Sequence, residues 1–251
     1  MFGFATFAFV GGLAAGSFVT VVAHRVPLRV SIVRPRSRCP ECGTKIAAYD
    51  NIPVVSWLLL RGRSRCCGEP IPVRYPLTEL AVAALFVVTA VVLRGVWVDV
   101  LLGLVFVSTL VAVTLTDLEQ RLIPNRILAV SAAICVVVAA IGDPSSLPER
   151  LGAAAAAGGL LFFAALAYPK GMGLGDVKLA AVMGLYLGRS VAPALFVALI
   201  GGSLLGITLM LKEGAAARKR AIPFGPFLAL GGVVGLLVGP ELIDTYLTAF
   251  S

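Results

Sequence analysis

The stretch Gly171-Met172-Gly173-Leu174-Gly175-Asp176-Val177-Lys178 sets an aspartate behind three alternating glycines, at the start of an apolar run. A carboxylate at the centre of a bilayer costs about 2.5–3.5 kcal/mol on insertion scales, so an acidic residue beside such a run needs a reason. Glycines let the backbone adopt conformations closed to other residues and let another chain approach closely. Asp117 ends a separate apolar run within Thr116-Asp117-Leu118-Glu119. We expect the two carboxylates to form a pair that carries out acid–base chemistry at the membrane face.

The composition indicates a membrane protein. Of the 251 residues, 59% are hydrophobic and 14% are charged, and the mean hydropathy is +0.98. Soluble domains carry about 25% charged and 45–50% apolar residues. The net charge of +8 would be compatible with a nucleic acid partner, but the basic residues lie between the apolar runs and not along one face. We therefore expect contact with membrane lipid and no nucleic acid.

Runs long enough to cross a bilayer predict an all-α, polytopic fold with about eight transmembrane helices. The runs lie near residues 3–22, 77–93, 97–115, 127–141, 151–167, 177–189, 191–211 and 224–246. The fifth run is rich in alanine and glycine, which allows close helix packing. No internal repeat is evident by inspection.

The distribution of positive charge predicts the orientation. The segments 23–76, 116–126, 168–178 and 212–223 hold 18 of the 21 Lys and Arg residues. Because cytoplasmic loops carry the excess of these residues, we expect both termini outside and both aspartates at the cytoplasmic side of the membrane. No basic residue precedes the first run, which argues for a retained span and against a cleaved signal peptide. The chain then divides into a first helix (1–22), a small cytoplasmic cysteine-containing insertion (23–76) and a membrane core of about seven helices (77–251).

The insertion holds two cysteine pairs. Cys39-Pro40-Glu41-Cys42-Gly43 is typical of a knuckle that presents two thiolates to one tetrahedral zinc ion. In Ser64-Arg65-Cys66-Cys67-Gly68 the cysteines are adjacent, and Ser64 stands where the first cysteine of a Cys-x-x-Cys pair would stand. The candidate ligands of a structural zinc site are thus Cys39, Cys42, Cys66 and Cys67, as an incomplete set that an unusual backbone would have to complete. Disulfides are the alternative, although a cytoplasmic segment is normally kept reduced.

Each aspartate motif also has a simpler interpretation. Asp117 alone could be an interfacial residue that ends a helix. The glycines before Asp176 could form a phosphate-binding loop, but a Gly-x-Gly-x-Gly pattern without a preceding strand of a βαβ unit is weak support for that.

Taken together, the motifs resemble the bacterial type IV prepilin peptidases (leader peptidase/N-methyltransferases), a Gly-x-Gly-Asp family of membrane aspartyl proteases. The matching stretches follow the family's order over nearly the whole chain. They are Gly16-Ser17-Phe18 to Arg25-Val26-Pro27, residues 50–57 with Leu60-Arg61-Gly62, residues 71–79, Asp117 with Ile123-Pro124-Asn125, residues 173–178, and Pro223-Phe224-Gly225-Pro226-Phe227. Two positions depart from the family pattern: Thr20 replaces an asparagine and Ser64 replaces a cysteine.

The resemblance implies an activity and its residues. Asp117 and Asp176 would be catalytic, with Gly173, Gly175 and Lys178 supporting the active-site loop. The substrates would be type IV prepilins or related pseudopilins, cleaved after the glycine that ends a short basic leader. The peptidase needs no cofactor. Zinc in the cysteine segment and S-adenosylmethionine for N-methylation of the new N-terminus would belong to bifunctional members, and Ser64 weakens both expectations.

Two carboxylates held close cannot both ionise easily, so the pair shares a proton. The ionised member would then take a proton from the attacking water, while the protonated member polarises the scissile carbonyl. An ion-coupled membrane transporter and an inactive assembly scaffold are the rival functions. A transporter predicts acidic residues deep in several spans, whereas the two aspartates lie at span ends.

Overall fold

The computed structural model describes residues 2–34, 36–168, 172–214 and 223–250. These residues form α-helices, short 3-10 helices and loops, with isolated β-bridges but no extended strand in these ranges. They divide into two compact units, Met1–Val92 and Leu93–Ser251. The all-α prediction is confirmed for this part of the chain.

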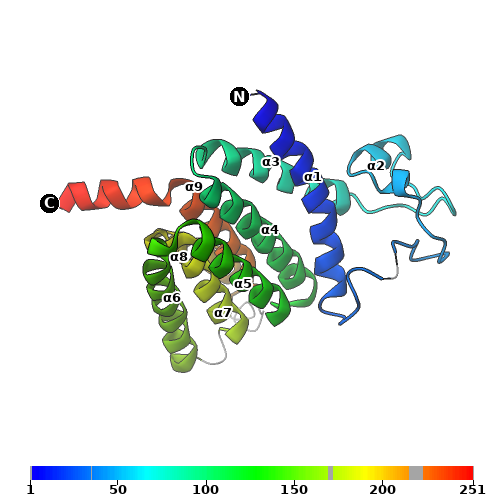
Figure 1. The fold of residues 1–251 in the computed structure, drawn as a ribbon. Helices are drawn as coiled ribbons and strands as arrows, with labels where there is room; N and C mark the ends of the chain where they lie inside the picture. Colours follow the sequence, from blue (N-terminus) through cyan, green and yellow to red (C-terminus); the bar gives the residue numbers. More distant parts are fainter. Residues whose placement is uncertain (1, 35, 169–171, 215–222, 251) are drawn as a thin grey trace. The chain divides into compact units, whose positions relative to one another are not determined.

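The first unit contains α1 (Phe2–Arg25), η1 (Ala48–Asn51), α2 (Val55–Leu59) and α3 (Arg74–Val92), with α1 packed along α3 (Figure 1). Gly16 allows this close approach, because a Cβ at that position would lie 2.7 Å from Cα of Glu79. The buried Glu79 carboxylate accepts a hydrogen bond from the backbone N–H of Val54, at 2.7 Å. Val54 has a φ of +61°, which is rare for a β-branched residue, so Glu79 holds a strained turn just before α2.

Two tight turns between α1 and α3 repeat with an offset of 25 residues. In the first turn, Cys39 N–H bonds to the carbonyl of Thr44, and an isolated β-bridge pairs Arg38 with Lys45. In the second turn, Ser64 N–H bonds to the carbonyl of Glu69, and the bridge pairs Arg63 with Pro70. Gly43 and Gly68 both have positive φ. The structure thus contains a short internal repeat that inspection of the sequence does not reveal.

The second unit is a helical bundle. It contains α4 (Trp97–Gln120), α5 (Asn125–Gly142), η2 (Pro144–Ser146), α6 (Leu147–Ala167), α7 (Leu174–Leu187), η3 (Gly188–Ser190), α8 (Val191–Glu213) and α9 (Gly225–Phe250). α6 packs along α7, α8 along α9, and α4 against both α5 and α9 (Figure 1). Each of the eight predicted apolar runs corresponds to one of the long helices.

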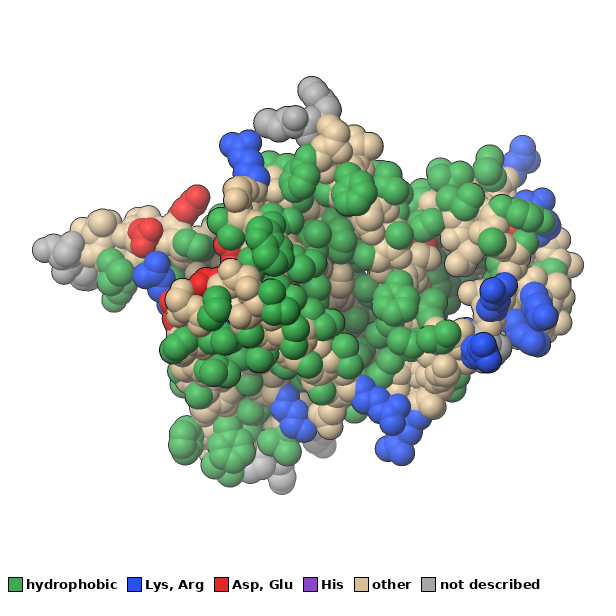
Figure 2. Space-filling view, in the orientation of Figure 1, with side chains coloured by type: hydrophobic (Ala, Val, Ile, Leu, Met, Phe, Trp, Pro, Cys, Tyr) green, Lys and Arg blue, Asp and Glu red, His purple; other side chains and the backbone are tan. Residues whose placement is uncertain are grey.

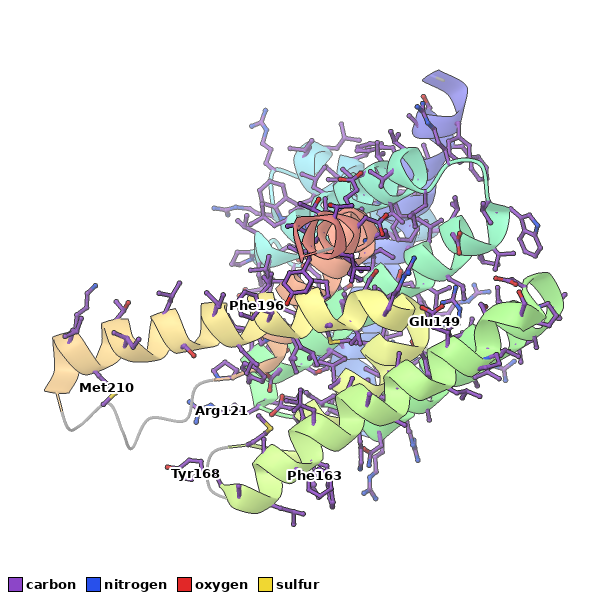
Figure 3. All side chains as sticks on the ribbon, turned by 90° about the vertical axis from the view of Figure 1, so that its left-hand side faces the viewer. Arg121, Glu149, Phe163, Tyr168, Phe196 and Met210 are labelled. Carbon is purple, nitrogen blue, oxygen red and sulfur yellow. The ribbon has the colours of Figure 1, made fainter. Side chains whose placement is uncertain are left out.

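Seven stretches of the described residues are long and apolar enough to cross a membrane, and the one at Leu174–Lys212 contains both α7 and α8. Large hydrophobic side chains cover much of the visible helix surface (Figure 2). Phe163 on α6 is 71% exposed and Phe196 on α8 is 65% exposed, and both point away from their helices (Figure 3). Exposed apolar surface on this scale marks a face that meets lipid or another protein. The chain is a multi-pass membrane protein.

A buried polar cluster joins three helices of the bundle. The hydroxyls of Thr109 on α4 and Ser131 on α5 lie 2.8 Å apart. The Tyr186 hydroxyl on α7 donates to the Ser131 carbonyl at 2.8 Å and accepts from the Ser131 hydroxyl at 3.1 Å. The Tyr186 ring stacks on Phe106, with centroids 4.8 Å apart. Each hydroxyl in this cluster therefore has a hydrogen-bond partner within the protein and does not depend on water for one.

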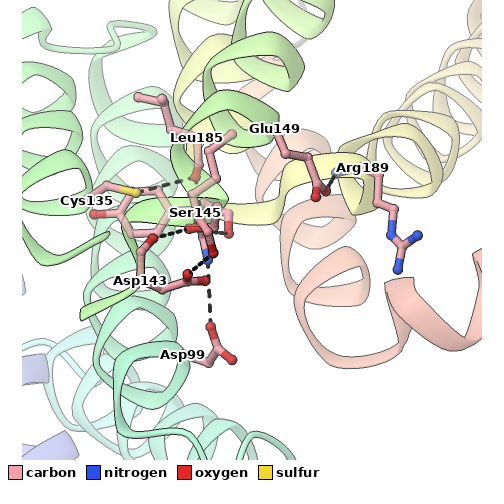
Figure 4. A network of polar contacts seen from close by, with 10 residues as sticks. Asp99, Cys135, Asp143, Ser145, Glu149, Leu185 and Arg189 are labelled. Atoms are coloured by element: carbon pink, nitrogen blue, oxygen red, sulfur yellow. Dashed lines mark hydrogen bonds and ion pairs between the residues drawn. The ribbon is translucent and has the colours of Figure 1, made fainter. Parts of the chain in front are cut away.

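A second polar network lies at the end of the bundle where α4 begins and α7 ends (Figure 4). The Arg150 guanidinium donates to the carbonyls of Leu185 and Tyr186, the last turn of α7, at 3.2 and 2.8 Å. It also lies 3.7 Å from Asp99, in the first turn of α4. Arg150 thereby bonds to free carbonyls at the end of α7 and pairs with an acidic residue at the start of α4.

Glycine determines the close packing of α6 on α7 that the composition of the fifth run predicts. A Cβ at Gly184 would lie 2.6 Å from Cα of Ala154 in the opposite helix, so a side chain there would push the helices apart. We expect Gly184→Val to lower the free energy of unfolding by about 1–3 kcal/mol, the usual cost of overpacking. Thermal unfolding of the purified protein in detergent measures this change. Gly159→Val on α6 is the matched control, because nothing lies within 4 Å of its Cβ position, and an equal loss in both variants would contradict the explanation.

Candidate active site

Asp117 lies in the last turn of α4 and is 6% exposed. Its Oδ2 accepts a hydrogen bond from the backbone N–H of Gly225, at 2.9 Å. Gly225 is the first residue of α9, so the carboxylate sits at the N-terminus of another helix, where free N–H groups and the helix dipole favour negative charge. Beyond Asp117, Arg121 ends α4 in a left-handed conformation, with φ of 52° and ψ of 41°.

Asp176 is the third residue of α7 and is half-buried. Its Oδ2 accepts a hydrogen bond from the backbone N–H of Gly173 at 3.3 Å, and its own N–H donates to the Gly173 carbonyl at 3.1 Å. This reciprocal pair caps the helix and turns the carboxylate back towards the loop before α7. Each aspartate therefore lies at a helix N-terminus: Asp176 at its own, and Asp117 at that of α9.

One contact links the segments that carry the two aspartates. Gly175 lies against Ile123, and a Cβ there would come within 3.0 Å of the Cβ of that isoleucine. Ile123 belongs to the loop between α4 and α5, six residues after Asp117. This contact places the loop after Asp117 beside the start of α7, and the pairing of the two carboxylates stays a prediction.

The other residues expected around the loop have different roles. Gly173 has an ordinary φ of −83°, and the nearest atom to a Cβ there would be Asp176 Oδ2 at 3.5 Å, so its N–H matters more than its lack of a side chain. Lys178 donates to Asn125 Oδ1 at 3.0 Å and thus links the starts of α7 and α5. Two residues apart on a helix, Lys178 and Asp176 do not share a face. Some residues used in the sequence analysis lie outside the described residues. They are Gly171 of the glycine stretch, and the basic residues Lys170 and 218–220 that were used to predict the orientation.

Sequence reasoning missed the part played by Gly225. A Cβ there would lie 2.7 Å from Asp117 Oδ2, so only glycine lets the carboxylate reach the N–H. The neighbouring rings fix its position, because Phe224 lies against Gly202 and Phe227 against Gly201, both on α8. The signal was visible as a glycine between Phe224 and Pro226 at a helix start, but nothing in the sequence says which carboxylate it faces.

The four cysteines of the insertion converge in the first unit. Their sulfur atoms all lie within 4.8 Å of one another, although the adjacent Cys66 and Cys67 come from one turn. The sequence analysis expects an unusual backbone where the two cysteines are adjacent. Neither Cys66 nor Cys67 has a positive φ, so a left-handed conformation at these residues does not bring their thiols together. A cluster of this kind has the donor atoms to bind a metal ion.

The thiols differ strongly in acidity. Hydrogen bonds with the side chain and backbone of Thr44 lower the pKa of Cys42 to about 6. Hydrogen bonding to Cys42, whose sulfur lies 3.2 Å away, raises the pKa of Cys66 to about 12. Nearby, Arg65 of the second turn makes a bidentate ion pair with Asp50 of η1. The ion pair lowers the pKa of the Asp50 carboxyl and links the second turn to η1.

Comparison with known proteins identifies the family of the chain. Residues 10–93 match the bacterial peptidase A24 N-terminal domain, and residues 104–211 match the type IV leader peptidase family. The chain is 36% identical to a prepilin leader peptidase/N-methyltransferase of Bacillus subtilis, over 95% of this chain and 96% of that protein. It is 35% identical to one from Aeromonas hydrophila (96% and 93%) and 41% identical to one from Myxococcus xanthus (86% and 66%). No solved structure matches the chain.

Fold and site define a multi-pass helical membrane protein with two aspartates held at neighbouring helix ends. The chain belongs to the type IV leader peptidase family, and it is a peptidase by that membership.

Replacing Gly225 tests the contact that holds Asp117. We expect Gly225→Ala to lower peptidase activity about 10²-fold, because a methyl group 2.7 Å from Oδ2 displaces the carboxylate by a large fraction of an ångström. Peptide-bond hydrolysis by the purified variant measures the loss. Gly206→Ala on α8, where nothing lies within 4 Å of the new methyl, should retain full activity. Normal turnover by Gly225→Ala would show that the hydrogen bond does not position the aspartate.

Proposed function

We propose that this chain is a membrane aspartyl endopeptidase that removes the short basic leader of type IV prepilins or related pseudopilins after a glycine. The observation that supports the proposal is that Asp117 and Asp176 each accept a backbone N–H at a helix N-terminus, from Gly225 and Gly173 respectively. The names of the relatives, prepilin leader peptidases, supply the class of substrate. Family membership favours this function over an ion-coupled transporter or an inactive scaffold.

The proposed mechanism uses one shared proton. The ionised carboxylate removes a proton from a water molecule as that water attacks the scissile carbonyl, and the protonated carboxylate donates its proton to the carbonyl oxygen. When the tetrahedral intermediate collapses, the proton on the former carbonyl oxygen returns to the aspartate that was protonated at the start. The proton taken from water passes from the other aspartate to the leaving amine. The N–H groups of Gly225 and Gly173 fix one oxygen of each aspartate, which leaves the other oxygen of each for water and substrate.

We place the reaction in residues 77–251, at the cytoplasmic side of the bacterial inner membrane. The supporting observation is the concentration of 18 of the 21 Lys and Arg residues in the segments on the side of both aspartates. A substrate with a basic leader on that side would present its cleavage site to the membrane face.

Conservative replacement of each aspartate tests the pair. Co-expressed with a type IV prepilin, the wild-type chain should remove the leader, whereas Asp117→Asn and Asp176→Asn should each slow removal about 10²–10⁴-fold, the usual contribution of a general acid or base. Leader loss is followed on a gel, with the membrane level of each variant checked.

Asp244→Asn is the matched control, since Asp244 is an exposed carboxylate on α9. It should process prepilin normally. Processing that survives both active-site changes would rule out the mechanism, and no processing by the wild type would point to another substrate or to one of the rival functions.

The names of the relatives also support a second activity, N-methylation of the new N-terminus with S-adenosylmethionine. Membranes containing the chain, incubated with labelled S-adenosylmethionine and pre-cleaved pilin, should transfer label to the pilin. Asp176→Asn membranes should transfer it equally, because the cleaved substrate needs no peptidase. Absence of label in both would leave a peptidase alone.

Any metal held by the cysteine cluster would have a structural role in this scheme. The peptidase step needs only the two carboxylates and water, so it requires no cofactor.

A further inference from the structure

The short helix α2 carries apolar side chains on its outer side and a polar one on its inner side. Leu58 is 62% exposed and Leu59 is 77% exposed, and the neighbouring Val55 is exposed as well. Ser56, in contrast, is buried. A helix on a water-exposed surface shows the reverse pattern, with apolar residues towards the core and polar residues towards the solvent. The outer side of α2 therefore suits an apolar environment.

Contacts within the first unit fix the rotation of α2 about its axis. Trp57 donates its indole N–H to the Ile71 carbonyl at 3.0 Å. The Trp57 ring also lies against Gly62, where a Cβ would come within 2.9 Å of it. The neighbouring Ser56 hydroxyl bonds to the Ile52 carbonyl. Turning the two leucines inward would break these contacts, so the apolar side of α2 stays on the outside.

A hydrogen bond sets the depth of α2 in the membrane. The backbone N–H of Val54, the residue before α2, donates to the Glu79 carboxylate at 2.7 Å. α3 has 19 residues, so it is about 28 Å long and close to the hydrocarbon thickness of about 30 Å. The whole of α3 is thus needed to cross the bilayer. Because Glu79 lies five residues after Arg74, the first residue of α3, it is about 7.5 Å inside that end of the span. α2 begins close to the same depth.

Basic residues follow directly after α2. Arg61 and Arg63 are both exposed, on either side of Gly62. The segment 23–76 as a whole holds ten Lys and Arg residues but three Asp and Glu residues, and Figure 2 shows Lys and Arg side chains on the part of the molecule where Figure 1 places α2. Guanidinium groups bind phosphate oxygens through paired hydrogen bonds, and an anionic leaflet attracts basic residues beside it. An apolar helix followed by arginines matches the order of hydrocarbon and headgroup layers.

We propose that α2 and the two arginines after it form an interfacial anchor that binds anionic phospholipid. Val55, Leu58 and Leu59 lie among the lipid chains at the edge of the hydrocarbon. Arg61 and Arg63 bind the phosphates of the headgroups. The anchor holds the cysteine-bearing segment against the membrane, and it does not depend on the peptidase activity.

Photo-crosslinking tests the contact with lipid chains. The full-length chain with Leu59→p-benzoylphenylalanine, reconstituted in nanodiscs of phosphatidylcholine and phosphatidylglycerol, should form lipid adducts on the peptide that carries α2. Mass spectrometry detects these adducts. The same photoreactive residue at Glu41, an exposed position in the first cysteine-bearing turn, is the control and should form no lipid adduct. Crosslinks from position 59 to the second unit or to a second copy of the chain, in place of lipid, would contradict the proposal.

Hydrogen exchange tests the choice of headgroup. The amides of residues 54–63 should exchange more slowly in nanodiscs that contain phosphatidylglycerol than in phosphatidylcholine alone. The expected factor is about fivefold for each arginine, the usual gain of a basic residue at an anionic surface. Arg61→Gln/Arg63→Gln should lose this difference. Arg34→Gln/Arg36→Gln removes the same charge from exposed positions elsewhere in the segment and should retain it.

Three results of the exchange experiment would overturn the anchor. They are equal exchange in the two kinds of nanodisc, a difference that survives Arg61→Gln/Arg63→Gln, and equal slowing by inorganic phosphate added to phosphatidylcholine nanodiscs, which would show a phosphate site and not a lipid site. Thermal unfolding of each variant in detergent separates loss of lipid binding from misfolding, since the glutamine variants should unfold at the wild-type temperature.

Discussion

The site depends on one hydrogen bond, from the backbone N–H of Gly225 to the carboxylate of Asp117. A buried group left without its partner costs about 1–3 kcal/mol, and more when it is charged. The bond exists only because α9 starts at Gly225, and α9 is seated there by two phenylalanines against the glycine pair Gly201 and Gly202 of α8. The position of the first aspartate is therefore set by helices α8 and α9, which begin 74 and 108 residues further along the chain.

The second aspartate is held in the same physical way but locally. Asp176 caps its own helix through Gly173, and Gly175 keeps that turn against the loop that follows Asp117. A short sequence motif is enough to cap the helix at Asp176, whereas the residues that hold Asp117 come from distant segments of the chain. The free N–H groups of two helices thus provide the donors for two acidic groups.

The helices were largely predictable from sequence, because a bilayer demands long apolar runs and each run became a helix. The two aspartates were chosen because each lies at the end of an apolar run in a stretch that resembles a family motif, and their catalytic role stays a prediction. What could not be predicted was pairing in space: that Gly225 faces Asp117, that Lys178 bonds to Asn125, and that Cys66 turns towards Cys42. The repeated turns escaped notice because they share backbone hydrogen bonds and a few glycines and cysteines, and little else.

The buried cluster of Thr109, Ser131 and Tyr186 has a consequence for the direction of the active-site side chains. Rotating α4 or α7 by a single residue, about 100°, would break its hydrogen bonds, and in lipid no water would replace them. Thr109 lies eight residues before Asp117, and Tyr186 lies ten residues after Asp176. The cluster therefore fixes the rotation of both helices about their axes at a level about 12–15 Å from the aspartates, and with it the direction in which each carboxylate leaves its helix.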